Sequence, residues 1–435
     1  MALAAGVMAL VVGAMTVGAQ AEGAAVDAAF ARFFGAADRP AAERLAGDVI
    51  ATGVSFDEAY GRLRRGRRYD PEPLRGVQRL TRRTTDGLEH PYTLVIPDDY
   101  DATRAYQVRV QLHGGIARPS PQPDRDGRDR IAGDADQIAV YPGGWADAMW
   151  WYGNQVENLT GLLGDLKRRY NVDENRVYLT GISDGATGAY FMALRDTTPW
   201  ASFLPLNGHM MVLANPSTGA DGQLYPGNAV NKPWFIVNGG QDRLYPTRSV
   251  EPYVEHLRTI GATVVYHPQP DAGHDTSWWP RERESFEAFV RAHPRDALPD
   301  RLSWETERTD RYNRAHWLII DEMGSTGSDA SLRDTNLLDR GLMRLDIFPH
   351  HQPSGRVDLV RNGNRVDVST QGVRAFTLLL SPEEFNFSSP VTVVVNQRVA
   401  FEGRVEQDVA TLLTWAARDD DRTMLFGAEK RFLVE

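Results

Sequence analysis

The feature that most constrains the fold of this chain is an alternation of strand and helix patterns between about residues 90 and 292. Short β-rich runs lie at 92–96, 108–112, 138–141, 176–180, 234–237 and 263–266. Apolar residues at helical spacing lie between and after these runs, over 156–166, 186–194, 250–260 and 286–290. Alternation of this kind predicts an α/β architecture, with a doubly wound, mostly parallel sheet that helices cover on both faces.

The periodicity changes near Pro294, where short strand-like runs separated by turn signals begin. Two pairs of these runs flank an Asn-Gly pair at 362–363 and an Asn-Gln pair at 396–397. Asn-Gly between two strand patterns is a strong hairpin signal. We therefore expect residues 297–435 to form a separate β-rich domain that resembles a sandwich.

The first part of the chain has a different character again. Apolar residues from Phe30 to Leu63 recur at helical spacing, so residues 22–88 predict a small helical segment ahead of an α/β domain at 89–296. Residues 1–21 are small and apolar and end in Ala-Gln-Ala, which fits the rule for signal-peptide cleavage. We therefore expect an exported protein, periplasmic or secreted, with no further stretch long enough to cross a bilayer.

Composition excludes several classes of function. A chain of 435 residues is long enough for two or three domains. Its net charge of −10 is repelled by phosphate backbones, so we expect no nucleic-acid partner. It contains no cysteine, which excludes disulfides, cysteine nucleophiles and thiolate metal sites.

The strongest chemical signal is Gly-Ile-Ser-Asp-Gly at 181–185, directly between the strand predicted at 176–180 and the helix predicted at 186–194. A serine on such a sharp turn has a strained backbone and an exposed hydroxyl, as in the nucleophile turn of the α/β-hydrolase fold. The alternative is a simple glycine-rich turn. Because the strand–turn–helix context is present, we predict that Ser183 is a nucleophile.

A serine nucleophile needs a base and a group that orients the base, and in this fold they follow in the order acid, then histidine. Asp242 follows the strand at 234–237, and His274 follows the strand at 263–266. Both therefore end on the same sheet edge as Ser183. Alternatives are Asp221 and Asp271 for the acid, His267 for the base, and an Asx turn as the role of the aspartate.

The reaction also needs two backbone N–H donors for the developing oxyanion. One should belong to Asp184, the residue after the nucleophile, and the other to the loop after the strand that ends at Leu112. Gly115 is the predicted second donor, with Gly114 as the alternative. His113 is expected to support this loop by hydrogen bonding.

Aromatic residues gather in the loops at the same edge. We predict substrate contacts for Trp145, Trp151, Tyr245 and Trp278, although each ring could equally be part of the core. Asp271, His274 and Asp275 lie close together in sequence, but a serine hydrolase requires no metal. The sequence therefore predicts neither a metal site nor a cofactor.

Three runs resemble one group of enzymes. They are Leu-His-Gly-Gly at 112–115, Tyr-Pro-Gly-Gly-Trp at 141–145 and Asp-Glu-Asn-Arg-Val-Tyr-Leu-Thr-Gly-Ile-Ser-Asp-Gly at 173–185. In these runs the chain resembles the polyhydroxybutyrate-depolymerase and feruloyl-esterase type of α/β hydrolase. The resemblance covers about residues 90–292.

The resemblance implies that the family's serine, aspartate and histidine correspond to Ser183, Asp242 and His274. It also implies that the family's oxyanion residue corresponds to Gly115. The C-terminal segment is similar to the β-rich tail of many secreted esterases.

Together these features lead to one main hypothesis and two alternatives. The main hypothesis is a serine esterase that acts on a small-molecule or polymer-derived ester through an acyl-enzyme intermediate. A peptidase of the same fold is one alternative, because ester and amide cleavage use the same three residues. The other is an inactive protein that binds a polymer or a partner.

Overall fold

The computed structural model describes residues 23–121, 136–220, 222–324, 334–339, 343–350 and 352–434. The predicted signal peptide at 1–21 and the alternative acid Asp221 lie outside these residues. Within the described part of the chain, no helix is both long and apolar enough to span a membrane.

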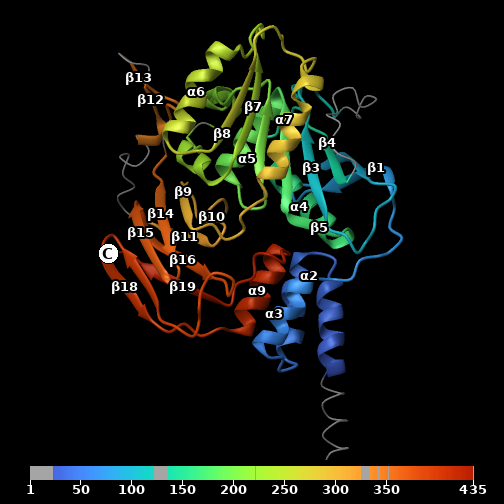
Figure 1. Ribbon diagram of the computed structural model, residues 1–435, viewed down its shortest axis with the longest axis vertical. Helices are drawn as coiled ribbons and strands as arrows, with labels where there is room; N and C mark the ends of the chain where they lie inside the picture. Colours follow the sequence, from blue (N-terminus) through green and yellow to red (C-terminus); the bar gives the residue numbers. More distant parts are fainter. Residues whose placement is uncertain are drawn as a thin grey trace, which may run out of the picture.

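The largest sheet has eight strands in the order β1-β2-β4-β3-β5-β6-β7-β8 (Figure 1). β2 pairs antiparallel with β1 and β4, and all other neighbours in the sheet are parallel. The strands are β1 (Gly76–Arg83), β2 (Glu89–Ile96), β3 (Tyr106–Leu112), β4 (Gln137–Pro142), β5 (Val172–Ile182), β6 (Ser202–Leu206), β7 (Trp234–Gly239) and β8 (Val264–Gln269). This mostly parallel sheet confirms the predicted α/β-hydrolase fold.

Helices cover both faces of this sheet, as the alternation predicted. The helices are α4 (Gly153–Arg169), α5 (Asp184–Arg195), α6 (Thr247–Thr259) and α7 (Trp279–Ala292). Successive residues of β7 show the two faces: Trp234 packs in the core cluster of α4, α5 and α6, whereas Phe235 packs in the cluster of α7. One strand was not predicted: β1 lies within the segment 22–88, which was expected to be helical.

The C-terminal region contains two further sheets, with the strand orders β18-β17-β15-β14-β9 and β10-β11-β16-β19, and a small β12-β13 pair. The strands are β9 (Arg301–Thr306), β10 (Arg314–Ala315), β11 (Leu318–Met323), β12 (Leu337–Asp339), β13 (Arg344–Asp346), β14 (Gly355–Asn362), β15 (Arg365–Gln371), β16 (Val373–Leu380), β17 (Val391–Val395), β18 (Arg398–Gly403) and β19 (Ala428–Leu433). Side chains of both larger sheets share one core, for example Leu359 and Leu378. Both predicted hairpins are present, as β14–β15 and β17–β18.

The N-terminal helices α2 (Arg39–Ile50) and α3 (Phe56–Arg65) pack against the last helix of the chain, α9 (Val409–Asp419) (Figure 1). Val49 and Leu63 share a core cluster with Leu412 and Leu413. The N-terminal helices and α9 therefore form one helical layer beside the β-rich region.

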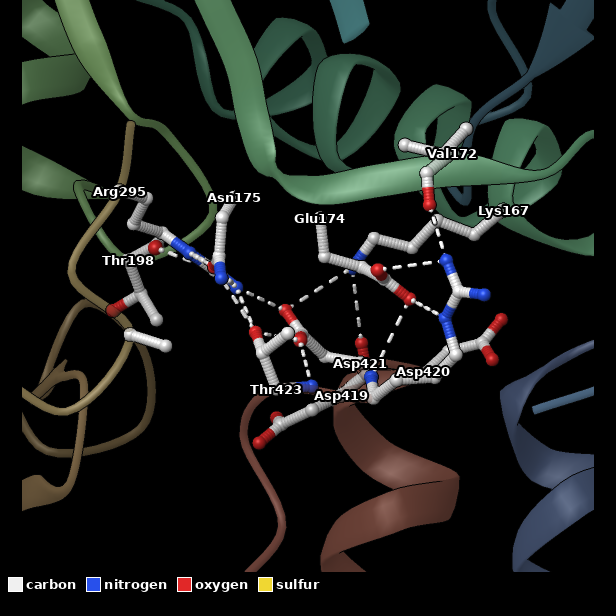
Figure 2. A network of polar contacts seen from close by, with 12 residues as sticks. Lys167, Val172, Glu174, Asn175, Thr198, Arg295, Asp419, Asp420, Asp421 and Thr423 are labelled. Carbon is white, nitrogen blue, oxygen red and sulfur yellow. Dashed lines mark hydrogen bonds and ion pairs between the residues drawn. The ribbon is translucent and has the colours of Figure 1, made fainter. Parts of the chain in front are cut away.

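A buried polar network joins residues 419–423, which begin at the last residue of α9, to the α/β domain (Figure 2). Arg295 donates to the Asp421 carboxylate at 2.7 Å, and both side chains are almost fully buried. Arg422 donates to Glu174 through Nε at 2.7 Å and Nη2 at 2.9 Å. Glu174 lies near the start of β5, so this network is at the opposite end of that strand from Ser183.

Candidate active site

Ser183 occupies the sharp turn between β5 and α5. Its backbone has φ 58° and ψ −117°, which is a strained conformation for any residue other than glycine. The neighbouring glycines allow the chain to pack this closely. A Cβ atom on Gly181 would lie 2.0 Å from the carbonyl oxygen of Gly185, and one on Gly185 would lie 2.1 Å from that of Leu112. The structure therefore has the strand–turn–helix geometry expected from the sequence.

Ser183, His274 and Asp242 form a continuous chain of hydrogen bonds. His274 Nε2 lies 2.9 Å from Ser183 Oγ, and His274 Nδ1 lies 2.7 Å from Asp242 Oδ2. A carboxylate only accepts hydrogen bonds, so Nδ1 carries the proton of the neutral imidazole and Nε2 is free to accept from the hydroxyl. This arrangement leaves the histidine poised to take a proton from Ser183.

The surroundings of Asp242 hold its carboxylate in one orientation. Oδ1 accepts from the backbone N–H groups of Leu244 at 2.7 Å and Tyr245 at 3.0 Å. The Asp242 side chain has no exposed surface, whereas the His274 side chain is 28% exposed. The Asp242 carboxylate is therefore inaccessible to solvent, whereas the His274 imidazole is partly exposed.

The alternative residues lie in other surroundings. His267 Nδ1 lies 2.5 Å from Glu282 Oε2, and Gln269 donates to the other oxygen of the same carboxylate. Asp242, and not Asp271, accepts from His274 Nδ1. Among the described residues, no group of three or more acidic or histidine side chains is arranged to hold a metal ion.

The loop after β3 lies directly against the serine. A Cβ atom on Gly114 would be 2.8 Å from Ser183 Cβ and 3.4 Å from Ser183 Oγ, and Gly115 has φ +67°. Asp184 Oδ2 accepts from the N–H of Ile116 at 3.0 Å and so ties this loop to the start of α5. Of the two predicted oxyanion residues, Asp184 directly follows Ser183, and Gly115 follows the glycine that lies against the serine. A hydrogen bond joins the loop of Gly115 to the start of α5.

His113 supports the same loop, as its position in the sequence suggested. Its Nδ1 lies 2.9 Å from the carbonyl oxygen of Gly114, and its Nε2 accepts from the N–H of Gly144 at 2.9 Å. Trp150 Nε1 donates to the His113 carbonyl at 2.9 Å. Sequence reasoning assigned Trp150 to no specific role, because one ring among several in a loop gives no sign of its partner.

Two asparagines that the sequence analysis did not single out support the loops around Asp242 and His274. Asn207, at φ 49°, donates to the carbonyl of Asp275, next to His274. Asn238, at the end of β7, donates to the carbonyl of Gly208. The Asn-Gly pair at 207–208 was a turn signal that could have drawn attention to this position.

The four predicted substrate-contact aromatics are in different environments. Tyr245 is half-buried and its ring centroid lies 5.8 Å from that of His274. Burial raises the pKa of Tyr245, and the charges of Asp184 and Asp242 add to the effect. Trp145 and Trp151 are largely buried, and Trp278 is completely buried in the core beneath α7. For these three, the alternative of core packing describes the structure, because large apolar rings are stabilised by burial.

Comparison with known proteins gives partial matches. No family model matches the chain. A lasso peptide isopeptidase of Asticcacaulis excentricus is 33% identical over 152 residues, which cover 28% of this chain and 21% of that protein. A probable feruloyl esterase C of Aspergillus niger is 30% identical over 159 residues, covering 34% of this chain and 57% of that protein.

A bifunctional acetylxylan esterase/xylanase of Neocallimastix patriciarum is 25% identical over 152 residues, covering 34% of this chain and 21% of that protein. The chain thus spans less than two thirds of the length of each of these curated relatives. Similarity to a feruloyl esterase confirms the resemblance that the sequence motifs predicted.

Proposed function

We propose that this chain is a serine hydrolase that cleaves carboxylic esters through an acyl-enzyme intermediate. The observation that carries the proposal is the hydrogen-bond chain from Ser183 through His274 to Asp242. General-base activation of a hydroxyl requires this geometry. Two of the similar proteins are named as esterases, which supports an ester as the substrate.

The proposed reaction begins when His274 Nε2 takes the proton of Ser183 as Oγ attacks the ester carbonyl carbon. The buried carboxylate of Asp242 stabilises the imidazolium that forms. His274 then gives the proton to the departing alcohol, which leaves the acyl group on Ser183. A water molecule, activated by the same imidazole, releases the acid and restores the serine.

The tetrahedral oxyanion would be bound by the backbone N–H groups of Gly115 and Asp184, with Gly114 as the alternative to Gly115. Asp184 is the first residue of α5, so its N–H has no acceptor within the helix and lies at the positive end of the helix dipole. Loss of one such donor lowers turnover by roughly 100- to 1,000-fold in related chemistry.

We propose Tyr245 and the neighbouring Leu244 as contacts for the apolar part of the substrate. Leu244 is 62% exposed beside the acid, and the Tyr245 ring lies next to the base. The substrate would be a small-molecule or polymer-derived ester, and the proposed steps use only side chains and backbone groups of the chain itself.

Peptide cleavage is the second candidate, favoured by the similarity to a lasso peptide isopeptidase. The same three residues would act, with His274 protonating a departing amine in place of an alcohol. Parallel assays on 4-nitrophenyl esters and on peptide 4-nitroanilides with the same acyl group would separate the two activities by their kcat/KM ratio.

A fluorophosphonate probe tests whether Ser183 is an activated nucleophile. By intact mass, we expect stoichiometric labelling of the wild type and no labelling of Ser183→Ala. The control is Ser217→Ala, which removes an exposed serine of the short 3-10 helix η2 (Pro216–Thr218) and should be fully labelled. A folded wild type that stays unlabelled would contradict the proposal and favour the inactive, polymer-binding alternative.

We further propose export of the chain and a β-rich domain at 297–435 that follows the catalytic domain at 89–296. Mass spectrometry of the protein recovered from the producing cells and from their medium tests cleavage after residue 21. Limited proteolysis tests the domain boundary, since a separate domain would give a stable fragment that begins near Pro294.

A further inference from the structure

Arg118 lies beside the glycine that is proposed to bind the oxyanion. Measured from the position of a Cβ atom on Gly115, Arg118 Nη2 is at 3.4 Å and Cζ is at 3.8 Å. The same position on the preceding residue, Gly114, is 3.4 Å from Ser183 Oγ. Of these two adjacent glycines, Gly114 thus lies against Ser183 and Gly115 lies against the guanidinium of Arg118.

The backbone that carries Arg118 is fixed at three points. The N–H of Ile116 donates to the Asp184 carboxylate at 3.0 Å. The N–H of Arg118 donates to the carbonyl of Ile116 at 2.7 Å, and its own carbonyl accepts from the N–H of Ala146 at 2.8 Å. Because Ile116 is also buried, the guanidinium extends from a rigid base and lies beside Gly115.

Two carboxylates also lie at this site. Asp242 is buried behind His274, and the carboxylate of Asp184 lies at the start of α5. These two carboxylates would repel an anionic substrate, whereas the exposed guanidinium of Arg118 would attract it. A guanidinium offers several N–H donors in a planar fork that matches a carboxylate. A substrate that ends in an alkyl chain has no acceptor for these donors.

We infer that Arg118 is a specificity-determining residue that selects esters bearing a carboxylate near the scissile bond, such as monoesters of dicarboxylic acids. The inference rests on the proposed function, because it assigns a substrate class to the same site. Arg118 binds the distal carboxylate while the ester carbonyl occupies the oxyanion site beside Gly115.

The test compares two substrates of similar length, mono-4-nitrophenyl glutarate and 4-nitrophenyl pentanoate. In Arg118→Gln, kcat/KM for the glutarate should fall about 10- to 100-fold, the size expected for a charged hydrogen bond, while kcat/KM for the pentanoate stays within about twofold. Arg118→Lys should retain part of the preference. Arg79→Gln, which removes the same charge from the distant strand β1, should change neither value.

Salt provides a second measurement. Raising ionic strength should lower kcat/KM of the wild type for the glutarate and leave that of Arg118→Gln nearly constant. An equal change for both substrates, or no change for either, would overturn the assignment of Arg118 even when the wild type cleaves esters. If the wild type cleaves neither ester and resists the fluorophosphonate, the proposed function itself fails.

Discussion

Replacing Asn228 with Ala should destabilise the protein more than most single changes outside the site. Asn228 lies in the 3-10 helix η3 (Pro226–Asn231) of the α/β domain and is 1% exposed. Its side chain binds β9, the edge strand of the five-stranded sheet: Nδ2 donates to the carbonyl of Glu305 and Oδ1 accepts from the N–H of the same residue. The Asn228 amide thus makes the pair of backbone hydrogen bonds that a neighbouring strand would make with β9.

The magnitude follows from the bonds that would be lost. Asn228 makes three hydrogen bonds of 2.8 to 2.9 Å, two with Glu305 and one with the carbonyl of Leu194. Each is worth about 1 kcal/mol net, and the buried backbone groups left without partners raise the cost further. We expect Asn228→Ala to lower the free energy of unfolding by about 3 to 4 kcal/mol.

Asn231 offers a matched control. It binds the same strand at Ser303 in the same two-way manner, but it is only half-buried, so water can replace its bonds. Asn231→Ala should therefore lower the free energy of unfolding by about 1 kcal/mol. Urea titrations followed by tryptophan fluorescence and by far-ultraviolet circular dichroism measure both changes.

The proposed role of the buried Asn228 amide in stabilising the edge strand β9 would be refuted by either of two results. One is an equal loss of unfolding free energy in the two variants, and the other is a loss below about 1 kcal/mol in Asn228→Ala. The two optical probes add information about cooperativity. If the α/β domain and the β-rich region unfold as one unit, the transitions by the two probes coincide, and Asn228→Ala shifts both together.

Other predictions concern the site and the core. Asp242→Asn should lower kcat by about 10⁴-fold in ester assays, because an amide cannot hold His274 in the reactive tautomer; an effect below tenfold would count against the assignment of the acid. Gly181→Ala should abolish the native near-ultraviolet spectrum, because its Cβ would lie 2.0 Å from a backbone oxygen, whereas Gly164→Ala in α4 meets only a flexible arginine at 3.3 Å and should fold. Burial, reinforced by the nearby Lys232 cation, holds the pKa of His316 well below its usual 6.5. The unfolded chain therefore binds a proton that the folded chain does not as the pH falls below about 6.5, and the free energy of unfolding should decrease there by at most about 1.4 kcal/mol per pH unit from this group. Urea titrations at pH 7 and pH 5 should show a smaller decrease for His316→Asn, and an unchanged decrease would exclude His316 as its source.

The sequence was informative where a local pattern has one structural solution. Alternating strand and helix patterns leave few options besides a parallel sheet, and glycines at 181 and 185 around a serine require a tight turn. The positions of Asp242 and His274 followed because parallel strands end at one edge. These predictions needed only the order of elements along the chain.

The sequence was less informative where the answer depended on a distant partner. The aromatic rings of Trp145, Trp151 and Trp278 follow strand ends, as Tyr245 does, yet they are buried. The position of an aromatic ring in a loop does not show whether the ring lines a cleft or is buried in the core beneath the loop. In the same way, the apolar face of the N-terminal helices gave no sign that α9 covers it.

The β-rich region contributes to the core of the α/β domain, and this bears on how the two parts can separate. Leu338 of β12 and its neighbours Ile347 and Phe348 are at most 2% exposed and belong to the same apolar cluster as α6. A cut near Pro294 would place the eight-stranded sheet and the C-terminal sheets on different fragments. The three side chains would belong to the C-terminal fragment but remain buried in the core of the α/β domain. Burying them contributes roughly 1.5 to 3 kcal/mol each, so the fragments should stay associated after cleavage until denaturant is added. Size-exclusion chromatography of the nicked protein tests this directly, and elution as two separate fragments in native buffer would show that the shared core is too weak to hold them.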